Sequence, residues 1–268
     1  MSIGSDTELP PLAKDEIAAA ILAGRAFADC AIRLEDMPED GDYTHAEFRN
    51  CTFQGANFAG GDFSRSRFIR CTWLSVRFAS TIFVDCSFEA CLFYDQTSKD
   101  GCEFARCDFR SASLQECVLI RCVFTRCELH DITARRSVFR AASLRQCTFG
   151  RRFSNKVERV QASFDHCNFS YADLAEVTLP GCHLTHCNFT GANLKAADLT
   201  GAHLIASNLE GADLDEARLA GADIRGCSVS DLNLLDLETH VGLKINLFQQ
   251  ESLFATMGVR VFPDPPFE

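Results

Sequence analysis

The sequence predicts an all-β fold in which the chain winds into a four-sided coil, and two observations support this. The first is a five-residue period: from Phe48 to Phe93 every fifth residue is aromatic. The second is a small residue, mostly Ala, Ser, Gly or Cys, two positions before each large one. A period of five fits neither a helix, with a period of about 3.6, nor a strand, with a period of about 2.

A chain that turns a corner every five residues points one large and one small side chain inward on each side. Four sides close a coil of about 20 residues, and stacked coils lie roughly 4.8 Å apart, like strands in a sheet. The pattern returns over 104–149 and 164–234, which indicates a solenoid whose coils cover each other's edges. One exception tests the pattern: Ala134 is small where a large residue is due, and Ile132 is large where a small one is due. We therefore expect the two side chains to exchange volumes within one side of the coil.

The fifteen cysteines all occupy the small inward position. We therefore predict that they pack in the core as small apolar side chains rather than form disulfides. Neighbours in a stack would be about 4.8 Å apart, beyond the Cβ separation of about 3.8 Å typical of a disulfide. Five of them are spaced by about 20 residues and should form such a stack: Cys107, Cys127, Cys147, Cys167 and Cys187.

The segment "GCHLTHC" (181–187) resembles a zinc cluster when read alone. In the repeat its cysteines point inward and its histidines outward, so they do not converge on one ion. His166 and His186, and likewise His183 and His203, are spaced so that each pair could stack on the surface and bind a stray metal ion, but two ligands make a weak site against the usual four. We predict no metal and no cofactor. Because no catalytic triad, phosphate loop or paired-carboxylate motif stands out, we also predict no enzymatic activity and expect the protein to act by binding.

The two ends of the chain depart from the repeat. Residues 1–44 are predicted to form an extension with a short helix over 11–24, ended by Gly24, before the coils of 45–234. Residues 235–268 should form a cap, with a helix from Leu243 to Gly258 and a short strand over 259–262.

Two polar insertions interrupt the coils, at 94–101 and at 150–160. The first separates Phe93 and Phe104. The second separates Phe149 and Phe164, which stay in register, so it is either a projecting loop or an imperfect coil. A solenoid with a purely structural role would not need such insertions. The first insertion is therefore local evidence that the solenoid presents a specific surface to a partner.

The net charge of −11 is unevenly distributed. Residues 1–50 carry 11 acids and 4 bases, residues 51–160 carry 11 acids and 17 bases, and residues 161–268 carry 15 acids and 5 bases. Two interpretations of the arginines in the middle segment are open. They contact the acidic surface of a partner protein or DNA held by that partner, or they only keep a rod with a Phe-rich core soluble. The apolar run 17–24 is too short for a bilayer and follows acidic residues, so we expect a cytoplasmic protein without membrane association.

The run "GANLKAADLTGAHLIASNLEGADLDEARLAGADI" (191–224) resembles the A(D/N)LxX consensus of the pentapeptide-repeat family, and the resemblance extends from about Ala46 to Leu234. It implies a right-handed quadrilateral parallel β-helix, here with an N-terminal helical segment and a C-terminal helix. Three segments, "FYDQTSKDGCEF" (93–104), "FGRRFSNKVERVQASF" (149–164) and "LFQQESLFATMGVRV" (247–261), are similar to the two loops and the C-terminal dimerisation segment of the quinolone-resistance (Qnr) branch. Residues 1–44 have no counterpart there.

Members of that branch bind type II topoisomerases, chiefly DNA gyrase, and relieve fluoroquinolone inhibition, with an acidic rod thought to imitate DNA. The resemblance implies such a partner and a homodimer, and no direct binding of duplex DNA. The first loop would contribute Tyr94, Asp95, Gln96, Thr97, Ser98, Lys99, Asp100 and Gly101. The second would contribute Arg151, Arg152, Phe153, Asn155, Lys156 and Arg159. The dimer interface would contain Leu243, Leu247, Phe254, Met257 and Val259. The alternative, favoured by residues 1–44, is a scaffold, effector or secretion-associated protein that uses the rod for an unrelated partner.

Overall fold

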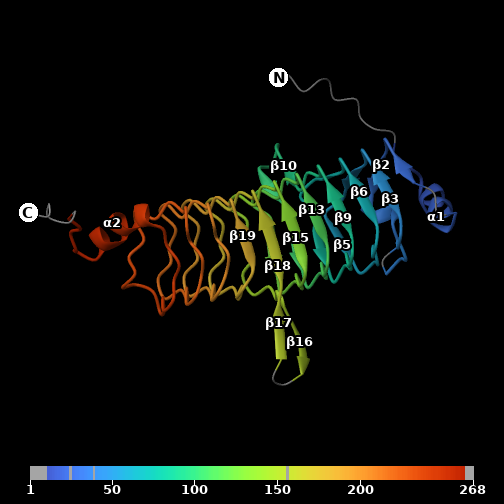
Figure 1. Cartoon of the computed structure of the whole chain (residues 1–268). Helices are drawn as coiled ribbons and strands as arrows, with labels where there is room; N and C mark the ends of the chain where they lie inside the picture. Colours follow the sequence, from blue (N-terminus) through green and yellow to red (C-terminus); the bar gives the residue numbers. More distant parts are fainter. Residues whose placement is uncertain (1–10, 24–25, 39, 155–156, 263–268) are drawn as a thin grey trace, which may run out of the picture.

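The computed structural model describes residues 11–23, 26–38, 40–154 and 157–262. The chain forms a right-handed, four-sided parallel β-helix, with α1 (Lys14–Leu22) at one end of the rod and α2 (Leu247–Thr256) at the other (Figure 1). The predicted solenoid is therefore confirmed.

Short strands on successive coils form parallel sheets along the sides of the rod. The largest sheet has eight strands. They are, in order, β1 (Phe27–Ala28), β3 (Glu47–Arg49), β6 (Arg67–Ile69), β9 (Ser87–Glu89), β13 (Ser113–Gln115), β15 (Ile132–Arg135), β18 (Ala162–Asp165) and β19 (His183–Thr185). A second side holds β5 (Asn57–Ala59), β8 (Arg77–Ala79), β12 (Glu103–Ala105) and β14 (Val123–Thr125), and a third holds β2 (Ala31–Arg33), β4 (Thr52–Gln54) and β7 (Thr72–Trp73). The 3-10 helix η1 (Leu34–Asp36) follows β2.

Beyond β19 the coils continue as single parallel bridges, such as those linking His183, His203 and Asp223 in turn. The pairing register keeps each large inward residue over its counterpart. Phe48 pairs with Phe68, and Phe68 with Phe88, 20 positions apart. Because the register holds, the large side chains of neighbouring coils stack directly on one another.

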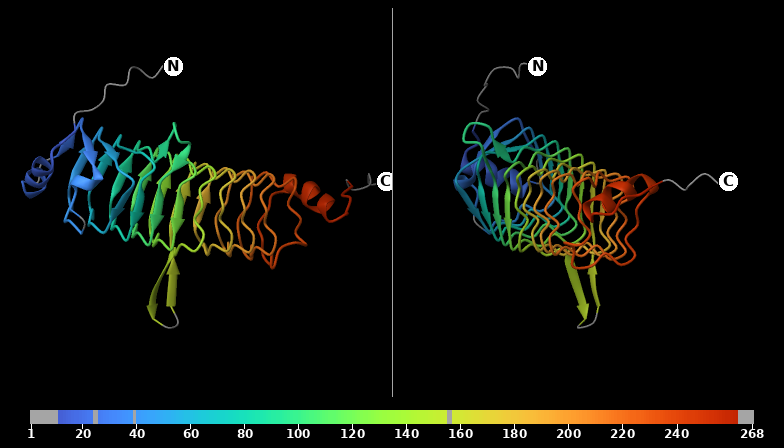
Figure 2. Two further views of the ribbon diagram at one scale, coloured as in Figure 1. Left: turned by 180° about the vertical axis from the view of Figure 1, so that it is seen from behind. Right: turned by 90° about the vertical axis from the view of Figure 1, so that its left-hand side faces the viewer.

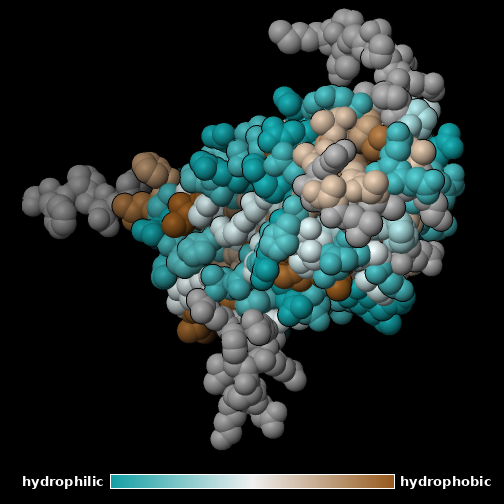
Figure 3. Space-filling model, turned by 90° about the vertical axis from the view of Figure 1, so that its right-hand side faces the viewer, coloured by the Kyte–Doolittle hydropathy of each residue, from teal (hydrophilic) through white to brown (hydrophobic). Residues whose placement is uncertain are grey.

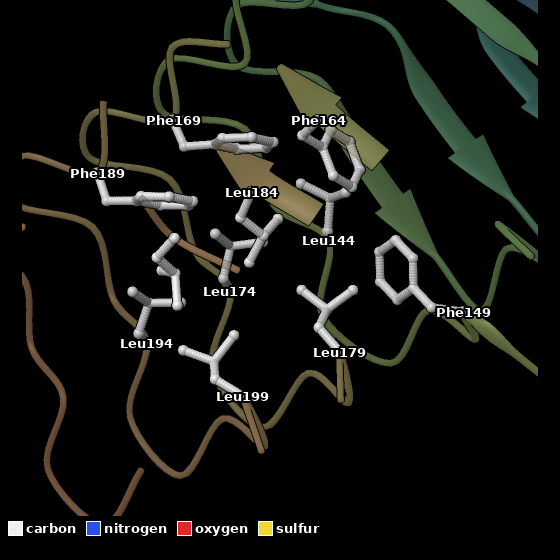
Figure 4. A pocket seen from close by; sticks show the side chains of 11 residues that line it. Leu144, Phe149, Phe164, Phe169, Leu174, Leu179, Leu184, Phe189, Leu194 and Leu199 are labelled. Atoms are coloured by element: carbon white, nitrogen blue, oxygen red, sulfur yellow. The ribbon is translucent and has the colours of Figure 1, made fainter. Parts of the chain in front are cut away.

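Stacked aromatic rings fill the N-terminal half of the core. The ring centroids of Phe68 and Phe88 are 4.8 Å apart with an interplanar angle of 5°, and those of Trp73 and Phe93 are 4.6 Å apart with an angle of 2°. Further along, leucines replace most of these rings (Figure 4). The void left between them is about 10 Å³ and its lining is wholly apolar, which leaves about the room of one water molecule and no polar group to hold a ligand.

The cysteines occupy the small inward position, as predicted, but the single stack expected of Cys107, Cys127, Cys147, Cys167 and Cys187 is wrong. The second insertion raises the pairing interval to 30 positions at this point, so Cys167 lies over Ser137 and not over Cys147. All fifteen are free, and only Cys147 is not fully buried. Several thiols lie against a backbone carbonyl of the preceding coil; for example, Cys71 Sγ donates to Phe48 O at 3.4 Å. Burial raises the pKa of Cys86 and Cys102 to about 12, which keeps these thiols protonated. Ala134 and Ile132 are both buried, so the exchange of volumes within this side is also confirmed.

The last coil ends in a capped helix. Asn246 accepts a hydrogen bond from the Gln249 backbone, and the Gln249 side chain accepts one from the Asn246 backbone, which makes a capping box. Leu243 precedes the helix rather than starting it, and packs against the core. The strand expected over 259–262 is wrong: these residues have no ladder partner within the described chain, and an extended segment without a partner is not a strand. Gly24 lies outside the described residues.

The division of the core into large and small positions predicts different stability losses for two substitutions near each other in the chain. Phe68→Ala should destabilise the fold by about 3–5 kcal/mol, because it empties a fully buried stacking position. Cys71→Ala, three residues away, should cost less than about 1.5 kcal/mol, since Ala fills the same small position in other coils. Urea unfolding followed by circular dichroism measures both; equal losses would contradict the division into large and small positions.

Candidate partner-binding surface

The first insertion is a short hairpin of β10 (Tyr94–Asp95) and β11 (Asp100–Gly101), which pair antiparallel. Its turn is ordered by Asp95, whose Oδ1 accepts from Thr97 N at 2.8 Å and whose carbonyl accepts from Lys99 N at 2.9 Å. The hydrogen bond from Thr97 N lowers the pKa of the Asp95 carboxyl. Five of the predicted residues, Gln96 to Asp100, are exposed at the tip, whereas Tyr94, Asp95 and Gly101 are half-buried.

The coils on both sides hold this hairpin against the rod. Ser98 Oγ lies 3.0 Å from Ser75 Oγ of the preceding coil, and Arg121 Nη1 of the following coil donates to Lys99 O at 3.0 Å. Gly101 lies directly on the next coil: a Cβ there would be 2.5 Å from the backbone of Arg121 and Cys122. Glycine is therefore required for this close approach, and the hairpin presents its tip in a defined position.

The second insertion is a longer antiparallel hairpin of β16 (Gly150–Ser154) and β17 (Val157–Val160). Its pairs include Gly150 with Val160 and Arg151 with Arg159, and its register shifts between Arg152 and Ser154, around Phe153. The hairpin projects away from the rod (Figure 1), which resolves the choice between a projecting loop and an imperfect coil. Asn155 and Lys156 lie outside the described residues.

A buried histidine fixes the base of the second hairpin. His130 is 5% exposed, its Nδ1 is 3.3 Å from Phe149 O and its Nε2 is 3.0 Å from Asp131 Oδ2. Phe149 immediately precedes β16, so this contact ties the start of the hairpin to the preceding coil. Sequence reasoning missed His130. The sequence did contain a signal for it: His130 lies one coil before Phe149, the residue after which the second insertion begins.

The two hairpins do not come together. They leave the rod on opposite sides, β10 and β11 on one and β16 and β17 on the other (Figure 2). Each insertion is accommodated in the pairing register: Leu114 pairs with Phe88, 26 positions earlier, and Phe164 with Ala134, 30 positions earlier, instead of 20. The large inward positions stay aligned, so both hairpins are added without breaking the core.

Part of the basic charge of the middle segment is neutralised within the rod. Arg110 binds Asp108 at 2.6 Å, and Arg136 lies 3.6 Å from Glu116. Arg106 and Arg126 are exposed corner residues on successive coils.

The C-terminal end exposes an apolar patch. The inner face of α2 packs Leu253 against the core, and Gln249 Nε2 donates to Ile224 O at 2.7 Å and Cys227 O at 2.9 Å. These bonds cap carbonyls at the open end of the solenoid. The outer face leaves Leu247 and Phe248 84% and 93% exposed.

Five exposed residues define the C-terminal patch: Leu247, Phe248, Val259, Val261 and Phe262. In the view onto the N-terminal end, brown apolar residues protrude at the left edge of the molecule (Figure 3). Of the predicted interface residues, Leu247 and Val259 belong to the patch, Phe254 and Met257 are half-buried, and Leu243 packs inward. Sequence reasoning missed Phe248, although it adjoins Leu247.

Comparison with known proteins identifies the family of the chain. The family model for pentapeptide repeats matches eight copies, over residues 41–72, 102–140, 167–204 and 192–231, and the chain belongs to this family. No curated protein matches it in a sequence comparison. In the described residues, no helix has the length and apolar character needed to cross a bilayer.

Among solved structures, the chain is similar to QnrB1, a plasmid-mediated fluoroquinolone resistance protein. A trypsin-treated form aligns with a TM-score of 0.67 and 22% identity over 89% of this chain and 99% of that one. The full-length form aligns with a TM-score of 0.61 and 22% identity over 88% and 99%. At this identity the similarity concerns the fold.

The packing of the first hairpin predicts the effect of one methyl group. Gly101→Ala should displace the hairpin, because the added Cβ meets backbone at 2.5 Å. Its tip should then be cut faster by proteases. The matched control is Gly201→Ala, where nothing lies within 4 Å and where alanines hold the same left-handed backbone on other coils, such as Ala196. Limited proteolysis with mass spectrometry compares them; equal cleavage would show that the hairpin is not held by this contact.

Proposed function

We propose that this protein is a non-enzymatic binding protein that docks on a type II topoisomerase, DNA gyrase, and relieves its inhibition by fluoroquinolones. The observation that carries the proposal is the pair of hairpins inserted on opposite sides of an unbroken core. The similarity of the fold to a fluoroquinolone resistance protein supports it. In this proposal the protein acts in the cytoplasm.

Charge supports a topoisomerase as the partner. Residues 161–268 carry ten more acids than bases, and their acidic and amide side chains lie on successive coils, as in the bridges that link Asp173, Asn193 and Asp213. A DNA-binding surface is positive and attracts an acidic rod. Free duplex DNA, which is itself negative, should be repelled by this half of the rod.

The hairpins would add specificity to this attraction. The first presents residues 96–100 in a fixed position, since Ser75 and Arg121 hold it to the rod. An ordered loop loses less conformational entropy on binding than a mobile one. The second carries Arg151, Arg152 and Arg159 in its strands, and these cations would contact acidic enzyme surface or DNA held by the enzyme.

The alternative function is a scaffold, effector or secretion-associated interaction protein with an unrelated partner. It is favoured by the N-terminal segment: α1, β1 and β2 precede residue 41, where the family match begins. This segment adds a surface that the repeats alone do not explain.

We also propose that the C-terminal patch forms a two-fold homodimer interface. Large exposed apolar side chains at one end of a rod are typical of an interaction surface, and most soluble homo-oligomers close by two-fold symmetry. Covering Leu247 and Phe248 with a second copy would remove the most exposed apolar area of α2 from water.

The function is tested by gyrase supercoiling in the presence of ciprofloxacin. Purified protein at micromolar concentration should restore supercoiling, and deletion of residues 95–101 should abolish the rescue while circular dichroism shows an intact fold. A protein that neither rescues nor inhibits gyrase would refute the proposal and favour the scaffold. Rescue that survives the deletion would refute the role of the first hairpin.

The dimer is tested by light scattering of the double variant Leu247→Asp, Phe248→Asp. These side chains are almost fully exposed, so the charges should leave the coil intact and convert a dimer to a monomer. Truncation before Leu243 should have the same effect or cause aggregation, since it removes the cap. An unchanged mass for the double variant would place any dimer interface elsewhere.

A further inference from the structure

Two histidines and one aspartate converge on the coil that follows the second hairpin. Asp165 ends β18, His166 follows it at the corner, and His186 holds the same corner one coil later. Asp165 Oδ1 lies 2.9 Å from His166 Nδ1 and 3.4 Å from His186 Nδ1. Within the described part of the chain, these three residues place one ligand atom each within 4.8 Å of the others.

The coil register brings them together. Asp165 pairs with Thr185 across adjacent strands, so the next residues, His166 and His186, also lie side by side. Their rings stack with centroids 4.4 Å apart and an interplanar angle of 14°. Thr185 Oγ1 donates to Asp165 Oδ1 at 3.2 Å and orients the carboxylate. The imidazoles are about half exposed, at 52% and 48%, so an ion from solvent can reach them.

The sequence predicted no metal because only two histidines were expected to meet; with Asp165 as a third donor, we propose that Asp165, His166 and His186 form a site for a divalent transition-metal ion of the Zn²⁺ class. Imidazole nitrogen and carboxylate oxygen are donors that such ions accept. A tetrahedral site with bonds of about 2.0–2.1 Å separates its ligand atoms by about 3.3 Å. The distances of 2.9 and 3.4 Å from the carboxylate to the two nitrogens lie on either side of this value.

Binding requires one adjustment. The rings are nearly parallel, so their Nδ1 lone pairs do not meet until one ring turns about χ2, a torsion with broad minima. The ion then replaces the protons shared between the imidazoles and Asp165, and water completes the coordination. The ion would link the first two coils beyond the second hairpin.

One neighbouring charge opposes the ion. Arg135 Nε lies 3.5 Å from Asp165 Oδ2 and competes for the carboxylate. Replacing it with a neutral side chain should therefore tighten metal binding. This effect is opposite in sign to that of ligand loss.

A second histidine pair on the same side of the rod, beginning in β19, provides a matched control for the metal site. His183 and His203 form a second stacked pair, with centroids 4.8 Å apart and an interplanar angle of 10°. Asp223 continues this row of residues, but its carboxylate is bound by Arg225 at 2.8 and 2.7 Å. The pair thus reproduces the stacking of histidine rings, but both oxygens of its neighbouring carboxylate are bound by Arg225.

The test is calorimetric titration of the full chain with Zn²⁺ in a reducing, non-chelating buffer. We expect one ion per chain, at least tenfold weaker binding for His186→Gln and for Asp165→Asn, and unchanged binding for His203→Gln. Arg135→Gln should bind several-fold more tightly. Absence of binding by the wild-type chain, or equal losses for His186→Gln and His203→Gln, would overturn the proposal.

A second readout identifies the ligands. Titration with Co²⁺ should produce visible d–d absorption in the wild-type chain and none in Asp165→Asn. A strong thiolate charge-transfer band would instead show that the ion binds cysteines, and would overturn the proposal. Unchanged circular dichroism of each variant excludes loss of fold as the cause.

Discussion

The stacking of each large inward side chain on its counterpart one coil away is the interaction on which the structure depends. Phe68 lies between Phe48 and Phe88, with centroids 5.0 and 4.8 Å away, and the small residue two positions earlier makes room for the turn. The contact buries the rings and keeps the backbones at hydrogen-bonding distance, so core packing and sheet register support each other.

This constraint also explains how the rod carries its insertions. Only the inward positions must repeat, whereas the corners between them face solvent, so a hairpin that satisfies its own backbone hydrogen bonds can be added at a corner. The first hairpin does this between Phe93 and Phe104, the second between Phe149 and Phe164. The parts proposed to contact a partner are therefore separate from the parts that hold the fold.

The period of five was enough to predict the solenoid, the inward cysteines and the places of both insertions, because these depend on spacing along the chain. The stacking of His166 on His186 was predictable from the same spacing. The contacts of individual polar side chains were not, because spacing does not say how a hairpin lies on the rod or how a side chain turns: Arg121 reaches Lys99, 22 positions away, and Asp165 meets His186, 21 positions away. The capping box at Asn246 could have been found from sequence, and would have started the last helix at Leu247 rather than Leu243. The strand expected over 259–262 failed because a strand needs a partner that the described chain does not supply.

The most direct test of the account is photo-crosslinking to gyrase from a reactive amino acid placed at Thr97, on the exposed tip of the first hairpin. The account predicts a crosslink to gyrase that excess unlabelled protein abolishes and that is absent when the same group is placed at Ala23, at the N-terminal end of the rod. Equal crosslinking from both positions, or none from Thr97, would contradict the claim that this solenoid presents its hairpin to a topoisomerase.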